Sequence, residues 1–203
     1  MITTSIEHPA ILNTMRYLEE EEGFRVTYLP VDCCGRVKLD ALKEALCPET
    51  ILVSIMYVNN EVGTVQPVEE AASIVKDYNP SILFHSDAVQ GFGKYRIYPK
   101  RQKIDLLSVS GHKIHGPKGT GFLYIGEKVK IRPILFGGGQ QRDIRSGTEN
   151  VPGIAGLGLA AELAYKDFDI KTALMRELKE YFISEIGKME NTVIHGVADE
   201  GSA

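Results

Sequence analysis

The sequence predicts an α/β fold in which a mostly parallel sheet carries helices on both faces. Short apolar runs alternate with segments of helical periodicity, which is typical of a parallel sheet. The run Ile51 to Tyr57, ILVSIMY, is almost continuously apolar, as expected of a strand buried on both faces. With 203 residues, 43% of them hydrophobic, the chain is large enough to bury a full core as one large domain.

The first half of the chain alternates strand and helix signals. A β-rich run at 2–5 precedes Pro9, and proline favours the first position of a helix. Further strands are expected at 25–29, 51–57 and 82–84. The helices between them place apolar residues on one face each: Ile11, Leu12, Met15 and Leu18 after Pro9; Leu42 and Leu46 after a cap at Asp40; and Ala71, Ile74 and Val75 after Pro67.

The second half begins with two strands, 106–110 and 121–125, that are close enough in sequence to pair antiparallel. A glycine-rich loop at 136–141 follows. The next helix, 151–166, is so rich in Gly and Ala that we expect it to pack closely against another backbone. A strand is expected at 192–197, after a longer helix, 172–189, with a buried side formed by Leu174, Leu178, Tyr181, Phe182, Ile186 and Met189.

Composition excludes several classes of function. The net charge of −4 and the isoelectric point near 5.8 argue against a nucleic-acid or anionic-membrane binder, and the basic segment 94–103 is expected to be a solvated loop. No stretch is apolar enough to span a membrane and the N-terminus lacks a signal pattern, so the expected location is the cytoplasm. Three cysteines, Cys33, Cys34 and Cys47, have no disulfide-framework spacing, and His112 and His115 have no ligand partners nearby, so no metal site is predicted.

The stretch with the clearest chemical signal is Ser110-Gly111-His112-Lys113, where a strand gives way to a turn. A lysine that is partly desolvated loses its proton readily, and its amine can form a Schiff base with an aldehyde cofactor such as pyridoxal phosphate. Ser110 and His112 supply hydrogen-bond donors suited to a phosphate. On this motif alone, an ordinary solvated lysine is the better interpretation.

A second signal lies upstream, where the apolar strand at 82–84 runs on to Asp87. An acid at the carboxyl end of a buried strand can pair with a pyridinium nitrogen and keep it protonated. If a helix starts after Asp87, Gln90 lies one turn further on and faces the same ligand. The alternative is a helix cap and a surface glutamine, and the presence of Lys113 after a neighbouring strand favours the ligand-binding interpretation over it.

Four motifs together resemble one family. HSDAVQGFGK at 85–94, SGHKIHGPKGTGFLY at 110–124, SIMYVNNEVGTVQPV at 54–68 and RSGTENVPGIAGLG at 145–158 are similar to the cysteine desulfurases of the NifS and IscS type. These belong to the class V aminotransferase-like pyridoxal phosphate enzymes. The resemblance runs from Thr4 to about Val197, and it implies the large domain of a fold type I pyridoxal phosphate enzyme.

The resemblance implies two catalytic residues and a cofactor, pyridoxal 5′-phosphate. Lys113 would carry the cofactor and act as the base, and His8, which alone resembles a helix cap, would stack on the pyridine ring and help to move protons. The cofactor-binding residues would be Asp87 at the ring nitrogen, Gln90 at the ring oxygen, Asn60 near that oxygen and the substrate carboxylate, Ser110 and His112 at the phosphate, and Thr148 at the phosphate of a neighbouring subunit.

The family's reaction and partners follow from the same resemblance. L-Cysteine would be converted to L-alanine, with its sulfur passed on as a persulfide to a sulfur acceptor or an iron–sulfur scaffold protein. The placement of Thr148 implies a homodimer. Neither a nucleic acid nor a membrane is an expected partner.

The sequence departs from the family pattern at both ends. The N-terminal phosphate-binding element and the small C-terminal domain with the nucleophilic cysteine are missing, so residues 1–190 are expected to be a cofactor-binding core and 191–203 the start of the small domain. Cys33, Cys34 and Cys47 precede Lys113 and do not match the family nucleophile. The chain alone is therefore expected to be inactive. Two alternatives remain: another class V enzyme, such as a selenocysteine lyase or an aminotransferase, and a non-catalytic dimerising fragment.

Overall fold

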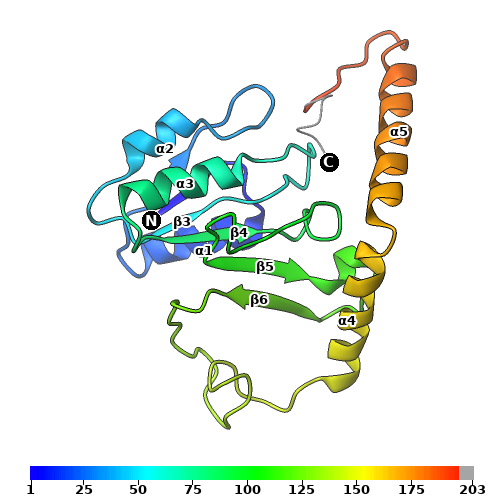
Figure 1. Ribbon diagram of the computed structural model, residues 1–203. Coiled ribbons are helices and arrows are strands. Elements are labelled where there is room, and N and C mark those ends of the chain that lie inside the picture. The colour runs from blue at the N-terminus through cyan, green and yellow to red at the C-terminus, as the bar shows by residue number, and fades with distance from the viewer. Residues whose placement is uncertain (197–203) are drawn as a thin grey trace.

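A computed structural model describes residues 1–196, which form a single six-stranded sheet with its helices (Figure 1). The elements in chain order are β1 (Ile2–Thr4), α1 (Pro9–Glu20), β2 (Thr27–Leu29), α2 (Leu39–Ala45), β3 (Leu52–Ser54), α3 (Val68–Tyr78), β4 (Leu83–Asp87), β5 (Leu106–Ser110), the short 3₁₀ helix η1 (Gly111–Ile114), β6 (Gly121–Ile125), α4 (Val151–Tyr165) and α5 (Phe168–Ile186).

The strand order is β2-β1-β3-β4-β5-β6. Strands β1 to β5 are parallel, and β6 pairs antiparallel with β5, as the sequence predicts. The chain first builds outward from β1 to β2 and then crosses back to β3 on the other side of β1. In open α/β sheets, ligands bind outside the carboxyl ends of the strands near such a reversal of strand order.

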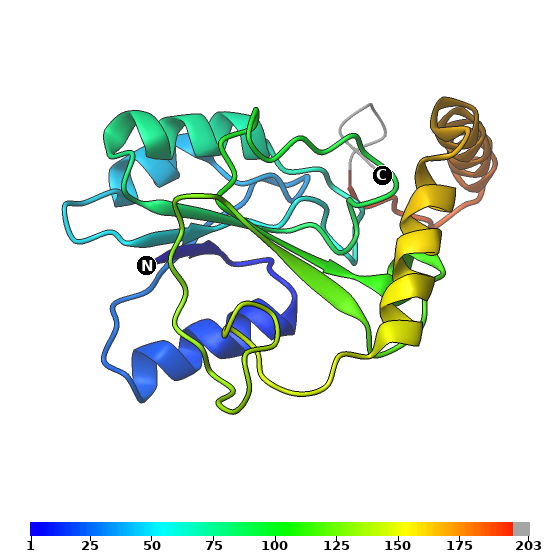
Figure 2. The same ribbon diagram turned by 60° about the horizontal axis from the view of Figure 1, so that its bottom comes forward.

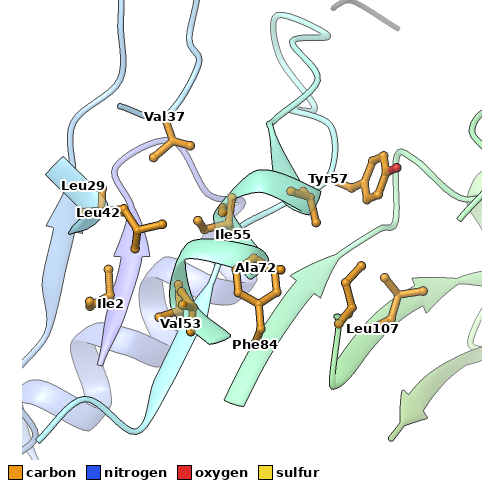
Figure 3. Packing of buried hydrophobic residues seen from close by; sticks show 14 of the residues in the cluster. Ile2, Leu29, Val37, Leu42, Val53, Ile55, Tyr57, Ala72, Phe84 and Leu107 are labelled. Atoms are coloured by element: carbon orange, nitrogen blue, oxygen red, sulfur yellow. The ribbon is translucent and has the colours of Figure 1, made fainter. Parts of the chain in front are cut away.

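Helices cover both faces of the sheet, which confirms the predicted fold class. Figures 1 and 2 show α2 and α3 on one face and α1 on the other. Between the sheet and the helices α2 and α3, the core contains Leu42 of α2, Val53 of β3 and Phe84 of β4, all 0% exposed (Figure 3). Alanines at the buried positions of α3 allow that helix to lie close to the strands.

Helix α4 packs against the turn that follows β5, as its glycine content predicts. A Cβ atom at Gly156 would lie 2.7 Å from Pro117 Cγ, and one at Gly116 would lie 3.3 Å from Ala160 Cβ. Ile114 of η1 packs with Leu157 and Ala160 in a small second core. This contact fixes the segment that carries Lys113.

Three predictions about local structure are wrong. Lys38, not Asp40, is the N-cap of α2, and Asp40 lies in the first turn, where it pairs with Lys43 at 2.8 Å. The predicted buried side of the last helix is mostly exposed, because α5 extends away from the sheet (Figure 1). Residues 192–196 form no strand, and Val197 lies outside the described residues.

Within residues 1–196, no helix is long and apolar enough to cross a membrane.

Candidate active site

Four of the predicted site segments follow strands that end at the same edge of the sheet. His8 follows β1, Asn60 follows β3, Asp87 ends β4, and Ser110 ends β5. Because these strands are parallel, their carboxyl ends lie together. The topology therefore gathers residues that are up to 102 positions apart in the sequence.

Asp87 is the buried acid of this edge. Its side chain is 9% exposed, and its Oδ1 accepts a hydrogen bond from the Val89 amide at 2.9 Å. Burial raises the pKa of Asp87, while the Val89 hydrogen bond and the positive charge of His8 partly oppose that rise. Among residues 1–196, no hydrogen bond reaches Asp87 Oδ2, so this oxygen can accept one from a ligand.

The expected helix after Asp87 does not form. Residues 89–91 form a turn in which the Gly91 amide donates to the Ala88 carbonyl at 3.0 Å, because the Asp87 carboxylate holds the Val89 amide in a local turn. Gln90 is half-buried in this turn, and its Oε1 accepts a hydrogen bond from Lys94 Nζ at 3.2 Å. Gln90 therefore lies just after the end of β4 in a turn and not in the expected helix.

In the turn after β5, two buried residues stand on either side of two exposed ones, and Lys113 is one of the exposed pair. Gly111 and Ile114 are buried against α4, whereas His112 and Lys113 are exposed. No side chain fits at Gly111, where a Cβ atom would lie 2.7 Å from Thr120 Oγ1. The buried pair anchors η1, so Lys113 projects from a fixed backbone.

Lys94 lies close enough to Lys113 for their charges to interact. Burial lowers the pKa of Lys94, and the positive charge of Lys113 lowers it further. The prediction of a solvated basic loop at 94–103 holds for the exposed Arg96, Lys100 and Arg101 but is wrong for the half-buried Lys94.

His8 caps helix α1 and is exposed, with its Nδ1 accepting a hydrogen bond from the Ala10 amide at 3.1 Å. The residue before it, Glu7, is 4% exposed, and its Oε1 accepts hydrogen bonds from Thr4 Oγ1 and from the Met56 amide, each at 2.8 Å. Burial, with a smaller contribution from the charge of Asp87, raises the pKa of Glu7 to about 7.

Asn60 and Thr148 are less tightly connected to this cluster. Asn60 is half-buried and donates to Glu61 Oε1 at 2.7 Å. Thr148 is exposed in the loop between β6 and α4, which lies beyond the β6 end of the sheet (Figure 1). Within residues 1–196, neither forms a hydrogen bond with another candidate residue.

Three buried or half-buried polar residues near the site were missed by sequence reasoning: Glu7, His85 and Lys94. His85 lies two residues before Asp87 and therefore on the same face of β4. Its Nδ1 and Nε2 lie 2.8 Å from Ser54 Oγ and 2.9 Å from Ser108 Oγ, and burial lowers its pKa to about 4. Polar residues stand within the otherwise apolar strand segments 52–54, 83–87 and 106–110. This pattern was a signal in the sequence that could have revealed the hydrogen-bonded row of Ser54, His85 and Ser108.

An exposed lysine and a buried acid at adjoining strand ends of an open α/β sheet fit a pyridoxal phosphate enzyme, and comparison with known proteins places the chain in one such class. The sequence model of the aminotransferase class-V family matches residues 1–202, so the chain belongs to that family. Within the family, it is similar to cysteine desulfurases of the IscS and NifS type.

Two curated relatives illustrate the similarity. The chain is 54% identical over 182 residues to a protein named putative cysteine desulfurase IscS 1 from Bacillus subtilis, covering 90% of this chain and 47% of the relative. It is 50% identical over 196 residues to cysteine desulfurase IscS from Methanosarcina thermophila, covering 97% and 48%. The chain thus spans about half the length of the curated relatives it matches.

Solved structures agree with the sequence matches. A NifS-like protein superposes with a TM-score of 0.92 at 47% identity, over 96% of this chain and 53% of the other. A structure described as SspA in complex with cysteine superposes with a TM-score of 0.76 at 45% identity, over 79% and 46%.

Proposed function

We propose that this chain forms the pyridoxal-phosphate-binding part of a cysteine desulfurase, an enzyme that converts L-cysteine to L-alanine and passes on the sulfur as a persulfide. The observation that carries the proposal is the placement of Lys113 in the turn directly after β5 and of Asp87 at the end of the neighbouring strand β4. The names of the relatives and the cysteine complex of SspA support L-cysteine as the substrate.

The residues at this edge fit the cofactor chemically. A buried carboxyl with a free Oδ2 suits a protonated ring nitrogen, because the pair would neutralise a charge that burial disfavours. An exposed lysine on a fixed turn suits an aldehyde. Ser110 and His112 flank that lysine with a hydroxyl and an imidazole, both of which can donate to a phosphate.

Each residue would then have one task. When bound, pyridoxal phosphate supplies an electron-withdrawing ring that makes the Cα proton of an amino acid acidic. Lys113 would hold the cofactor and remove that proton, and Asp87 would keep the ring nitrogen protonated. His8 would lie against the ring, Gln90 and Asn60 would donate to oxygens of the cofactor and substrate, and Ser110, His112 and a partner's Thr148 would hold the phosphate.

Reductive trapping tests the cofactor assignment. Pyridoxal phosphate added to the 203-residue chain should produce a visible absorbance band, and borohydride should then fix one cofactor on Lys113, as located by mass spectrometry of peptides. Lys113→Ala should abolish the fixed adduct, whereas Lys118→Ala, which changes an exposed lysine in the same turn region, should retain it. Equal trapping in the Lys113 variant would contradict the proposal.

A homodimer is also proposed. Large apolar side chains are exposed along α4, α5 and the loop before α4, including Val151, Leu174, Leu178, Phe136 and Phe182. A self-complementary partner that covers this surface would remove it from water. The same arrangement would let one subunit offer Thr148 to the site of the other.

We infer that residues 1–190 belong to the cofactor-binding domain and that 191–203 lead into a second domain. The proposed location is the cytoplasm, which is compatible with three free cysteines. The persulfide would pass to a sulfur acceptor or an iron–sulfur scaffold protein.

A further inference from the structure

Lys94 lies at the candidate site but has no task in the proposed function. It is half-buried, and among residues 1–196 it forms no ion pair with a carboxylate. Burying an ammonium without a compensating acid is unfavourable. A cation in this position therefore requires a physical reason.

The backbone on both sides of Lys94 is held by one hydroxyl group. The Gly93 amide donates to Tyr165 Oη at 3.1 Å, and Tyr165 Oη donates to the Tyr95 carbonyl at 3.0 Å. Gly93 has φ of +83°, and a Cβ atom there would lie 3.0 Å from Ile114 Cγ2. Helix α4 and η1 thus fix the origin of the Lys94 side chain next to the turn that carries Lys113.

The hydrogen bond from Lys94 Nζ to Gln90 Oε1 determines which way the Gln90 amide faces. An ammonium group has donors only, so the amide must turn its oxygen toward Nζ. The chemistry of the pair therefore assigns the orientation of an amide whose two ends look alike in most structures. The NH₂ group of Gln90 then points away from Lys94 and is available as a donor.

We propose that Lys94 is a positioning residue, which holds the Gln90 amide with its NH₂ group directed toward an acceptor oxygen of the bound ligand. The inference rests on the proposed function, because that function places Gln90 at the ring oxygen of pyridoxal phosphate. Without Lys94, the amide is free to present its oxygen instead, and two acceptors cannot form a hydrogen bond.

The orientation is tested first without cofactor, by ¹⁵N NMR of side-chain amides in the 203-residue chain. The two NH₂ proton resonances of Gln90 should be shifted from those of free glutamine and should move to the free values in Lys94→Met. Lys94→Arg, which keeps a donor, should retain the shift. Gln102 is the internal control, since its amide bonds to Tyr57 and Tyr98 and should not change. Unchanged Gln90 resonances in folded Lys94→Met would overturn the inference.

Cofactor affinity supplies a second test through a double-mutant cycle. Loss of one oriented hydrogen bond should weaken binding of pyridoxal phosphate about threefold to tenfold in Lys94→Met and in Gln90→Ala. The double variant should be no weaker than Gln90→Ala, because Lys94 acts through Gln90. Additive losses would show that Lys94 acts by another route. If the wild-type chain fixed no cofactor on Lys113, the proposed function would fail, and the amide spectra would still decide the role of Lys94.

Discussion

The Glu7 carboxylate accepts a hydrogen bond from the Met56 amide at 2.8 Å, across 49 positions of sequence. This bond joins the turn between β1 and α1 to the extended chain that follows β3. The residue after Glu7 is His8, which is proposed to lie against the pyridine ring of the cofactor. The residue after Met56 is Tyr57, whose amide donates a hydrogen bond to the Asp87 carbonyl at 2.8 Å. The Glu7–Met56 bond therefore sets the spacing between two sides of the candidate site.

Replacing Glu7 should change how stability depends on pH. Because the pKa of Glu7 is about 7 in the folded chain and lies near 4.5 when unfolded, only the unfolded chain loses this proton as the pH rises from 4.5 to 7. The free energy of unfolding should therefore fall across that window, by about 3 kcal/mol at most. Urea unfolding of Glu7→Gln between pH 4.5 and 7.5 should lack this fall. An unchanged slope would mean that Glu7 ionises normally.

His85 should contribute the opposite slope. Its pKa is lowered to about 4 from an ordinary value of 6.5, so only the unfolded chain gains a proton as the pH falls from 6.5 to 4. Folded stability should be lost as the pH falls through that window, on the order of 2 kcal/mol after allowance for partial exposure. The two effects oppose each other in the wild type. His85→Gln should therefore lose stability only as the pH rises, and a variant that still weakened toward pH 4.5 by the same amount would contradict the assignment.

Two glycines of α4 should respond in opposite directions to the same substitution. A methyl group at Gly156 would lie 2.7 Å from Pro117 Cγ, whereas one at Gly158 would meet nothing within 4 Å. Gly156→Ala should destabilise by roughly 1–3 kcal/mol through overpacking. Gly158→Ala should stabilise by up to about 1 kcal/mol, because alanine favours the helix. Thermal unfolding of the two variants provides the comparison, and a stabilised Gly156→Ala would show that α4 does not pack tightly on the turn.

Sequence reasoning predicted the sheet well because the strand signals were local. The apolar runs at 52–57 and 106–110 reflect burial that is completed within this chain, and so do the glycines of the helix at 151–165 that face the turn after β5. The prediction of a buried face on α5 was wrong for a related reason. Its apolar periodicity, which includes Leu174 and Leu178, indicates a covered surface, but residues 1–196 do not supply the cover.

The site was only partly predictable. Asp87 and Lys113 follow strands, so the rule that parallel strands share a carboxyl edge brings them together. Glu7 and Lys94 could not be found in this way, because a single glutamate or lysine in sequence is nearly always solvated. Only the fold reveals that the Glu7 carboxylate accepts a hydrogen bond from the Met56 amide. It also reveals that the Tyr165 hydroxyl is hydrogen-bonded to the backbone on both sides of Lys94.

The exposed apolar face of α5 should drive self-association. Leu178 and Phe182 are 59% and 63% exposed and lie one helical turn apart. Light scattering at increasing concentration should show a dimer or larger species. Leu178→Glu with Phe182→Glu should shift the equilibrium toward the monomer, whereas Glu180→Gln on the same helix with Lys188→Gln just after it should not. A wild-type monomer at high concentration would contradict a partner-covered surface.

Among residues 1–196, no hydrogen bond joins a cysteine side chain to a candidate site residue. Cys47 precedes β3, and its thiol lies 3.7 Å from Arg25 Nη2, near the amino ends of the strands and opposite the candidate site. Cys33 and Cys34 follow β2, with Sγ atoms 3.9 Å apart. Strand β2 is three positions from β4 in the sheet, a separation of about 14 Å at ordinary strand spacing.

This geometry predicts that the 203-residue chain releases no sulfide from L-cysteine above background. Desulfuration needs a ring that labilises the substrate and a thiolate that attacks its sulfur, and in the proposed function Lys113 with the cofactor would supply only the first. Incubation with pyridoxal phosphate, L-cysteine and a reductant should match the rate of pyridoxal phosphate alone. Slow exchange of the Cα proton with deuterated water, absent in Lys113→Ala, would show that the first function is present. Sulfide release well above background that disappeared in Cys33→Ser or Cys34→Ser, but persisted in Cys47→Ser, would show that the vicinal pair reaches the substrate after all.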